Sequence, residues 1–205
     1  MPGPEWCDSC SMHLPDVRWH DLGHGVLLCS AFGFVGPIRK TIIDWKEQQH
    51  RAARRRVQRW FAAGLLPLTA QRPDIVCIPI PSSPRNDRQR GARVLHDAVA
   101  AIGVEVGTGL ISARSRKDQT GLTRGERIEN MHNAFTWISD DPRPVLLIDD
   151  VVTSGSTLRA AATAVRGNGG HVWASFGLAR RGNLTSVVSR PEGLRLSCSD
   201  KEDSL

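Results

Sequence analysis

The segment VLLIDDVVTSGST, residues 145–157, joins an apolar run, two adjacent carboxylates and a loop of hydroxyls with a single glycine. Its first four residues, Val145 to Ile148, form the short apolar run that indicates a strand buried on both faces. Residues 154–170 then carry apolar side chains at helical spacing and end in the turn GNGG. A buried strand, a polar loop and a helix in this order predict one unit of a parallel α/β sheet.

Strand and helix patterns also alternate in the rest of the chain. Apolar runs and helical spacings lie, in chain order, at 74–81, 88–104, 110–113 and 171–179. We expect one further helix to begin at Pro37 and to run through an arginine-rich segment to Phe61, ending before Gly64 and Pro67. The first 30 residues show little periodicity. The predicted fold class is therefore α/β, a parallel sheet with helices on both faces.

The composition is that of an ordinary globular protein with an excess of positive charge. The 205 residues are 40% hydrophobic and 23% charged, which suits one domain with a small appendage. No apolar run is long enough to cross a membrane, and the start MPGPEWCDSC does not resemble a signal peptide. We expect a cytoplasmic protein without membrane insertion. The net charge of +6 suggests an anionic partner, either nucleic acid or a phosphorylated small molecule.

Much of the positive charge lies in the segment HRAARRRVQRW. Its arginines are Arg51, Arg54, Arg55, Arg56 and Arg59. Aromatic residues accompany them only at Trp60 and Phe61, whereas surfaces that bind single-stranded nucleic acid interleave aromatic and basic side chains. A solvated helix face is therefore favoured over a dedicated nucleic-acid surface.

The loop after the acid pair has the residues that bind a phosphate. Gly155 allows close approach of the backbone, the neighbouring hydroxyls donate hydrogen bonds, and a helix start favours an anion. The triphosphatase pattern G-x-x-x-x-G-K-[ST] and the dinucleotide pattern G-x-G-x-x-G are both absent from the sequence. Asp149 and Asp150 can accept hydrogen bonds from the two neighbouring hydroxyls of a ribose. Capping of the next helix would explain one aspartate but not two.

VLLIDDVVTSGST closely resembles the phosphoribosyl pyrophosphate (PRPP) signature of type I phosphoribosyltransferases. Further segments resemble one branch, the ComF-like competence proteins, which are also called amidophosphoribosyltransferase-like. In family order these are an N-terminal C-x-x-C, FVGPIRKTIIDWK, IPIPSSPRNDRQRG and DQTGLTRGERIENMHNAF. The resemblance extends from about Cys7 to Arg180. It implies a degenerate zinc-ribbon-like segment over 1–30, a phosphoribosyltransferase-like domain over 31–182 and a tail over 183–205.

The resemblance also implies roles for individual residues. The catalytic pair, which holds the ribose hydroxyls, would be Asp149 and Asp150. The 5′-phosphate loop would consist of Thr153, Ser154, Gly155, Ser156 and Thr157. The pyrophosphate loop would include Ser82, Ser83, Arg85 and Arg90. A mobile loop closing over bound PRPP would include Arg116, Lys117 and Gln119. Mg²⁺ would bridge pyrophosphate and ribose oxygens, the ligands that it prefers.

Two departures from the family pattern affect these expectations. Family members carry C-x-x-C twice, whereas this chain has Cys7 and Cys10 followed only by Cys29. A structural zinc site would need His13, His20 or His24 as its fourth ligand, and the alternative is a segment that has lost its metal. In the pyrophosphate loop the family has a histidine where Ser83 stands, and G-F-N-Q in place of residues 91–94. The missing polar side chains at Ser83 and residues 91–94 are expected to affect transfer of the phosphoribosyl group, whereas the residues expected to bind the ribose and the 5′-phosphate are unchanged.

Two functions follow from these features. The first is a Mg²⁺-dependent PRPP-binding protein that transfers the phosphoribosyl group to an unknown acceptor. Some relatives have a carboxylate where Thr153 stands, so 6-oxopurine salvage is not expected. The second is a non-catalytic accessory protein of DNA uptake that binds single-stranded DNA or proteins of the competence machinery.

Overall fold

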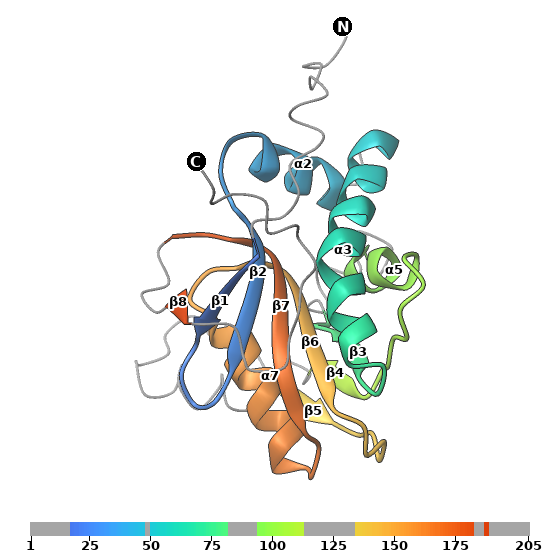
Figure 1. Cartoon of the computed structure of the whole chain (residues 1–205), viewed down its shortest axis with the longest axis vertical. Coiled ribbons are helices and arrows are strands. Elements are labelled where there is room, and N and C mark those ends of the chain that lie inside the picture. The colour runs from blue at the N-terminus through green and yellow to red at the C-terminus, as the bar shows by residue number, and fades with distance from the viewer. Residues whose placement is uncertain (1–16, 48–49, 82–93, 113–133, 183–186, 189–205) are drawn as a thin grey trace, which may run out of the picture.

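The structure is a computed structural model that describes residues 17–47, 50–81, 94–112, 134–182 and 187–188 (Figure 1). Its main sheet has six strands in the order β3-β6-β7-β2-β1-β8. The four parallel strands are β3 (Val76–Pro79), β6 (Val145–Val152), β7 (Val172–Arg180) and β2 (Leu27–Gly33). The strand β1 (Arg18–Asp21) is antiparallel to both of its neighbours, β2 and β8 (Val187–Val188). A mixed α/β fold with a mostly parallel sheet is thus confirmed.

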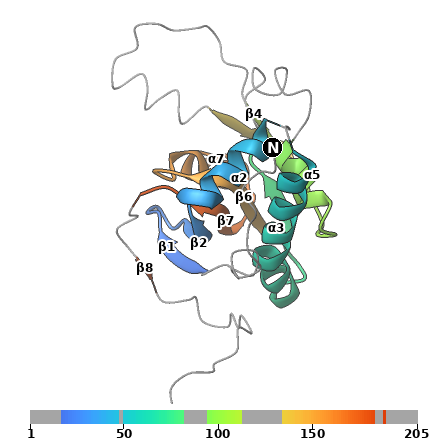
Figure 2. The same cartoon turned by 90° about the horizontal axis from the view of Figure 1, so that it is seen from above.

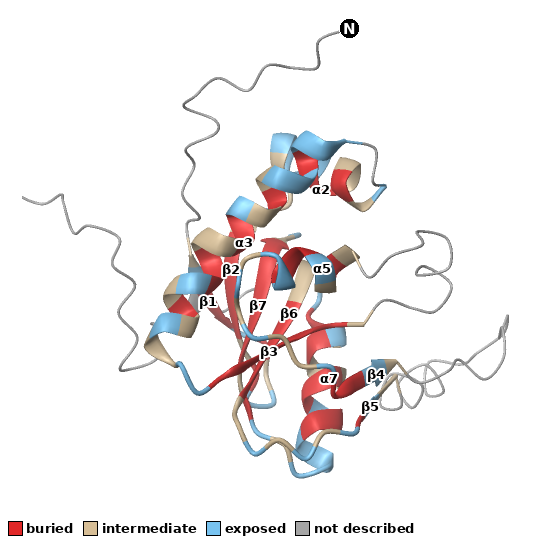
Figure 3. Cartoon of the chain, turned by 90° about the vertical axis from the view of Figure 1, so that its right-hand side faces the viewer, coloured by how far each residue is buried: buried red, intermediate tan, exposed pale blue. Residues whose placement is uncertain are grey.

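Helices cover both faces of this sheet, as expected. One face carries α2 (Gly36–Lys46), α3 (Arg51–Gln71) and α5 (Val94–Ala100). The other carries α7 (Ser156–Gly167) and a two-stranded sheet of β4 (Leu110–Ser112) and β5 (Phe135–Trp137). Seen from above and from the side, α3 and α7 lie on opposite sides of the strands (Figures 2 and 3).

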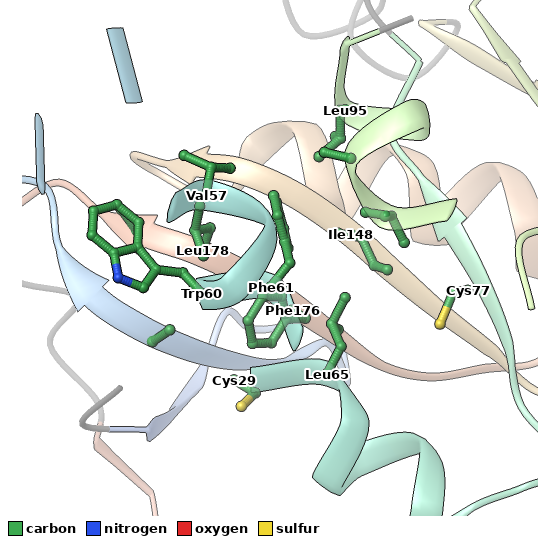
Figure 4. Packing of buried hydrophobic residues seen from close by; sticks show 14 of the residues in the cluster. Cys29, Val57, Trp60, Phe61, Leu65, Cys77, Leu95, Ile148, Phe176 and Leu178 are labelled. Carbon is green, nitrogen blue, oxygen red and sulfur yellow. The ribbon is translucent and has the colours of Figure 1, made fainter. Parts of the chain in front are cut away.

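Alternating side chains of β6 enter the two cores. Leu146 and Ile148 belong to the cluster under α3, whereas Val145 and Leu147 belong to the cluster under α7. In the larger cluster, Phe61 of α3 packs on Phe176 of β7 with ring centroids 6.2 Å apart (Figure 4). Each large apolar side chain buried in this way contributes about 1.5–3 kcal/mol to folding. This burial on both faces explains why the sequence of β6 reads as an unbroken apolar run.

The long helix expected from Pro37 to Phe61 is two helices, and its expected end was wrong. α2 ends at Lys46 and α3 begins at Arg51. α3 then continues through Gly64 and Pro67, because its last turns cover the sheet with buried leucines. Gly64 fits there because a Cβ at this position would lie 2.5 Å from Phe176 Cζ. Packing of the helix against β7 therefore outweighs two residues that ordinarily end helices.

The N-terminal part of the described chain is integrated into the main sheet. β2 lies between β7 and β1, and its pairing with β7 is parallel. The domain boundary expected after residue 30 thus falls within a strand, and β8 lies within the expected tail of 183–205. The strands β1, β2 and β5 were not predicted from the sequence, because the first two lie in a segment with little periodicity and β5 has only three residues.

Candidate functional site

The acid pair lies within the last part of β6, at the edge where the parallel strands end. The strand extends beyond the predicted residue 148 to Val152, so that Asp149 and Asp150 are part of it. Asp149 stands in register with Gly177 of β7, and both aspartates are half-buried. Ligands of open α/β sheets bind at this edge, which makes the pair the starting point for a candidate site.

Asp150 is paired with a lysine from a distant part of the sequence. Lys46, the last residue of α2, places its Nζ 2.7 Å from Asp150 Oδ1. The two side chains are only 26% and 16% exposed, so water screens this ion pair incompletely. No local pattern marks Lys46 as a site residue, because its partner lies 104 positions away. The contact ties the end of α2 to the carboxyl end of β6.

Asp149 is in a different electrostatic environment. Its Oδ1 accepts a hydrogen bond from the backbone N–H of Asp150 at 2.8 Å. Burial, and secondly the charge of Asp150, raise the pKa of Asp149 to about 7. Hydrogen bonds from the backbone and the charge of Lys46 oppose this rise in pKa without cancelling it. A group that binds beside Asp149 and brings positive charge would therefore stabilise its ionised form.

The phosphate-type loop leads from β6 into α7, and its backbone shape depends on Gly155. This residue precedes the first residue of α7 with φ of +72°, the left-handed region that glycine adopts without strain. A Cβ at Gly155 would also lie 2.9 Å from the side-chain methyl carbons of Leu22. No side chain caps α7, which rules out capping of this helix by either aspartate. Among the described residues, the first-turn N–H groups have one side-chain acceptor, the Ser154 Oγ that lies 3.4 Å from the N–H of Ser156.

Two arginines fasten this loop and its helix to the turn between β1 and β2. Arg159 donates from Nη1 to the carbonyl oxygens of Ser154, at 2.9 Å, and Leu22, at 3.1 Å. About two turns further along α7, Arg166 donates to the carbonyl oxygens of His24 and Gly25 at 2.8 and 2.9 Å. The sequence gives no sign of these contacts because they link segments more than 130 residues apart. They hold the loop in place before any ligand binds.

The predicted hydroxyl donors of the loop are available to a ligand. Thr153, Ser154 and Thr157 are exposed, and Ser156 is half-buried. Ser154 Oγ lies 3.0 Å from Ser156 Oγ and also accepts from the N–H of Ser156 at 3.4 Å. The structure thus brings the acid pair and the predicted 5′-phosphate loop together as neighbouring parts of one strand–loop–helix unit.

The other predicted site residues lie outside the part of the chain that the structure describes. They are Ser82, Ser83, Arg85 and Arg90 of the pyrophosphate loop, Arg116, Lys117 and Gln119 of the mobile loop, and the cysteines Cys7 and Cys10. The chain enters the pyrophosphate segment directly after β3, which ends at the same sheet edge as β6. The roles of these residues remain predictions.

Cys29, the third expected zinc ligand, is a core residue of β2. It is fully buried in the cluster under α3, and burial raises the pKa of its thiol to about 12. Cys29 stands opposite Trp19 in the β1–β2 ladder and His20 stands opposite Leu28, so Cys29 and His20 point to opposite sheet faces. Among the described residues, no three histidines, cysteines or acids are grouped as metal ligands. Cys7 and Cys10 lie outside the described residues, so the zinc site stays a prediction.

The arginine-rich segment forms the first half of α3. Arg51, Arg54, Arg55 and Arg59 are exposed, whereas Trp60 and Phe61 point into the core. The aromatic residues of this segment are therefore not part of its basic surface. This arrangement agrees with a solvated helix face.

No protein-family model and no curated protein sequence matches this chain. None of the helices in the described part of the chain is both long and apolar enough to span a membrane. Fold and site together define an α/β protein with paired carboxylates and a glycine-led helix start at the carboxyl edge of its sheet.

Proposed function

We propose that this chain is a PRPP-binding, phosphoribosyltransferase-like protein of the ComF type. The observation that carries the proposal is the arrangement of Asp149 and Asp150 six and five residues before Gly155, on one strand–loop–helix unit. The acid pair is placed to accept hydrogen bonds from the ribose 2′ and 3′ hydroxyls. The uncapped first turn of α7 and its hydroxyls are suited to the 5′-phosphate.

The donor atoms of the pair fit a magnesium ion. Mg²⁺ prefers carboxylate and phosphate oxygens and retains several waters, so two carboxylates and the oxygens of the substrate suffice. The raised pKa of Asp149 is consistent with a carboxylate beside which a cation is bound in the functional state. Bound there, Mg²⁺ would neutralise charge on the pyrophosphate. Asp150, held by Lys46, would keep its orientation throughout.

The transfer itself is a displacement at C1 of the ribose. A nucleophile on the acceptor forms a bond to C1 while the bond from C1 to the pyrophosphate oxygen breaks, and pyrophosphate leaves with the electron pair. The ribose becomes positively charged in the transition state, so nearby carboxylates that orient its hydroxyls also stabilise it electrostatically. We expect Asp149 and Asp150 to serve this purpose. The acceptor is not assigned.

Calorimetric titration with PRPP, with and without Mg²⁺, tests the proposal. The wild-type chain should bind PRPP in a Mg²⁺-dependent manner, and the Asp149→Asn/Asp150→Asn variant should lose about tenfold or more in affinity. Asp44→Asn, which removes one carboxylate from an exposed pair with Lys40 on α2, is the control and should bind normally. Absence of binding at millimolar PRPP, or equal binding by the variant, would refute the proposal.

A second candidate function rests on the exposed arginines of α3. Arg54, Arg55 and Arg59 form a basic surface that would bind the phosphates of single-stranded DNA, as a competence accessory protein requires. Charge reversal at these three positions should abolish salt-dependent binding of an oligonucleotide, while Asp150→Ala should leave it unchanged. Binding that does not depend on salt or on the arginines would exclude this function. Competence-machinery partners and a cytoplasmic location remain predictions.

A further inference from the structure

A pocket lies beside the candidate site, between the end of α2, the first turn of α3 and α5. Its lining residues are Trp45, His50, Arg51, Arg54, Val94, Asp97 and Ala98. Both α2 and α5 lie next to α3 (Figures 1 and 3). Trp45 immediately precedes Lys46, which binds Asp150, so the pocket and the acid pair share the last turn of α2. Among the described residues, none that is assigned to the ribose or the 5′-phosphate lines this pocket.

Positive charge is concentrated on the α3 wall of the pocket. Arg51 and Arg54 are exposed, and among the described residues neither guanidinium forms an ion pair with a carboxylate. The first turn of α3 contains no acidic residue, and its N-cap residue His50 makes no side-chain capping bond. Guanidinium groups bind carboxylate and phosphate oxygens through paired hydrogen bonds. This wall is therefore suited to one anionic group of a ligand.

The rest of the pocket has a different chemical character. Val94 is half-buried and supplies apolar surface above Trp45 and Ala98, which are only 3% and 2% exposed and form the floor. The Trp45 indole makes an edge contact with Phe61 at 6.2 Å between ring centroids. Asp97 of α5 is the one carboxylate among the described lining residues, and its side chain is 54% exposed with His96 Nδ1 at 3.3 Å. A negative group there repels a second anion and accepts a hydrogen bond from an N–H donor.

We infer that this pocket binds a small planar carboxylate that also carries an amino group, with the carboxylate on Arg51 and Arg54, the amine on Asp97 and the ring against Val94. The apolar floor, the paired arginines and the opposed aspartate each select one part of such a ligand. A plain dianion would satisfy the arginines but would place charge beside Asp97. This site is separate from the acid pair, and its occupancy does not depend on the proposed PRPP binding.

The test uses the full chain and the three aminobenzoate isomers, with benzoate and aniline as probes that carry only one of the two groups. Binding is measured by saturation-transfer NMR and calorimetry. At least one aminobenzoate should bind more tightly than both single-group probes, and it should still bind to Asp149→Asn/Asp150→Asn. If no isomer binds saturably, or if benzoate and aniline bind as well as the best isomer, the inference is wrong.

Matched variants assign the two ends of the ligand. Arg51→Ala/Arg54→Ala should weaken the best isomer by about tenfold, because it removes charge-assisted hydrogen bonds. Arg55→Ala/Arg59→Ala removes the same charge from a neighbouring pocket on α3 and should change affinity by less than about twofold. Asp97→Asn should lower the ratio of aminobenzoate to benzoate affinity. Equal effects of both arginine pairs, or an unchanged ratio in Asp97→Asn, would overturn the assignment.

Discussion

The first turns of α7 and α3 flank the same edge of the sheet, but they differ in what determines their structure. The start of α7 is fixed by a left-handed glycine, by its contact with Leu22 and by the hydrogen bonds of Arg159. The start of α3 instead presents Arg51 and Arg54, whose side chains the described structure leaves without a carboxylate partner. Backbone conformation and packing determine the start of α7, whereas the start of α3 exposes positive charges that could bind a ligand.

The largest loss of stability at the start of α7 is expected from Gly155→Ala. A side chain in the left-handed region costs about 1 kcal/mol, and overpacking against Leu22 adds about 1–3 kcal/mol. Gly169→Ala is the matched control, since Gly169 has φ of +80° but no atom within 4 Å of an added Cβ. Thermal and denaturant unfolding should show a larger loss of stability for Gly155→Ala. Equal losses would mean that Leu22 yields and that the loop is less fixed than its contacts imply.

A second effect should come from the titration of Asp149. Its pKa is raised from 3.8 to about 7, so between these values the folded state binds more protons than the unfolded state. The free energy of unfolding should therefore fall as the pH rises from about 4 to about 7. Asp149→Asn should lack this part of the pH dependence, measured by urea unfolding at several pH values. A wild-type slope that the variant retains in full would show that other groups cause it.

The smallest effects compare one arginine from each side. Arg159→Ala loses two hydrogen bonds to carbonyl oxygens and should cost about 1–2 kcal/mol of stability. Arg54→Ala, in the exposed first turn of α3, should change stability by less than about 0.5 kcal/mol. If the two variants lose similar free energies of unfolding, the hydrogen bonds of Arg159 do not make the start of α7 more stable than that of α3.

The sequence predicted what is encoded locally. The apolar run of β6, the loop glycine and the spacing of Leu158, Ala161, Ala162 and Val165 lie within one short segment, and all four helix residues are buried as expected. Lys46 could not be recognised as the partner of Asp150, since nothing near Lys46 refers to a strand 104 residues away. The continuation of α3 past Gly64 was also not predicted. Glycine is needed there because the Phe176 ring on β7 leaves no room for a side chain, and this contact joins residues far apart in the sequence.

The N-terminal strands show the same limit. Trp19, Cys29 and Leu28 fill both faces of the sheet, but their segment is too short and mixed for period-two alternation to identify it. Only its position between β7 and β8 shows that it belongs to the sheet. The pyrophosphate and mobile loops remain the parts of the candidate site that rest on the sequence alone.

The position of β2 in the sheet has a consequence for synthesis of the chain. β2 is parallel to β7, a strand that the ribosome makes about 140 residues later. At ordinary elongation rates, an apolar strand with an unsatisfied edge must wait on the order of 10 s for its partner. A nascent chain of this topology is thus exposed to premature association, and holding chaperones should engage it before α7 and β7 leave the ribosome.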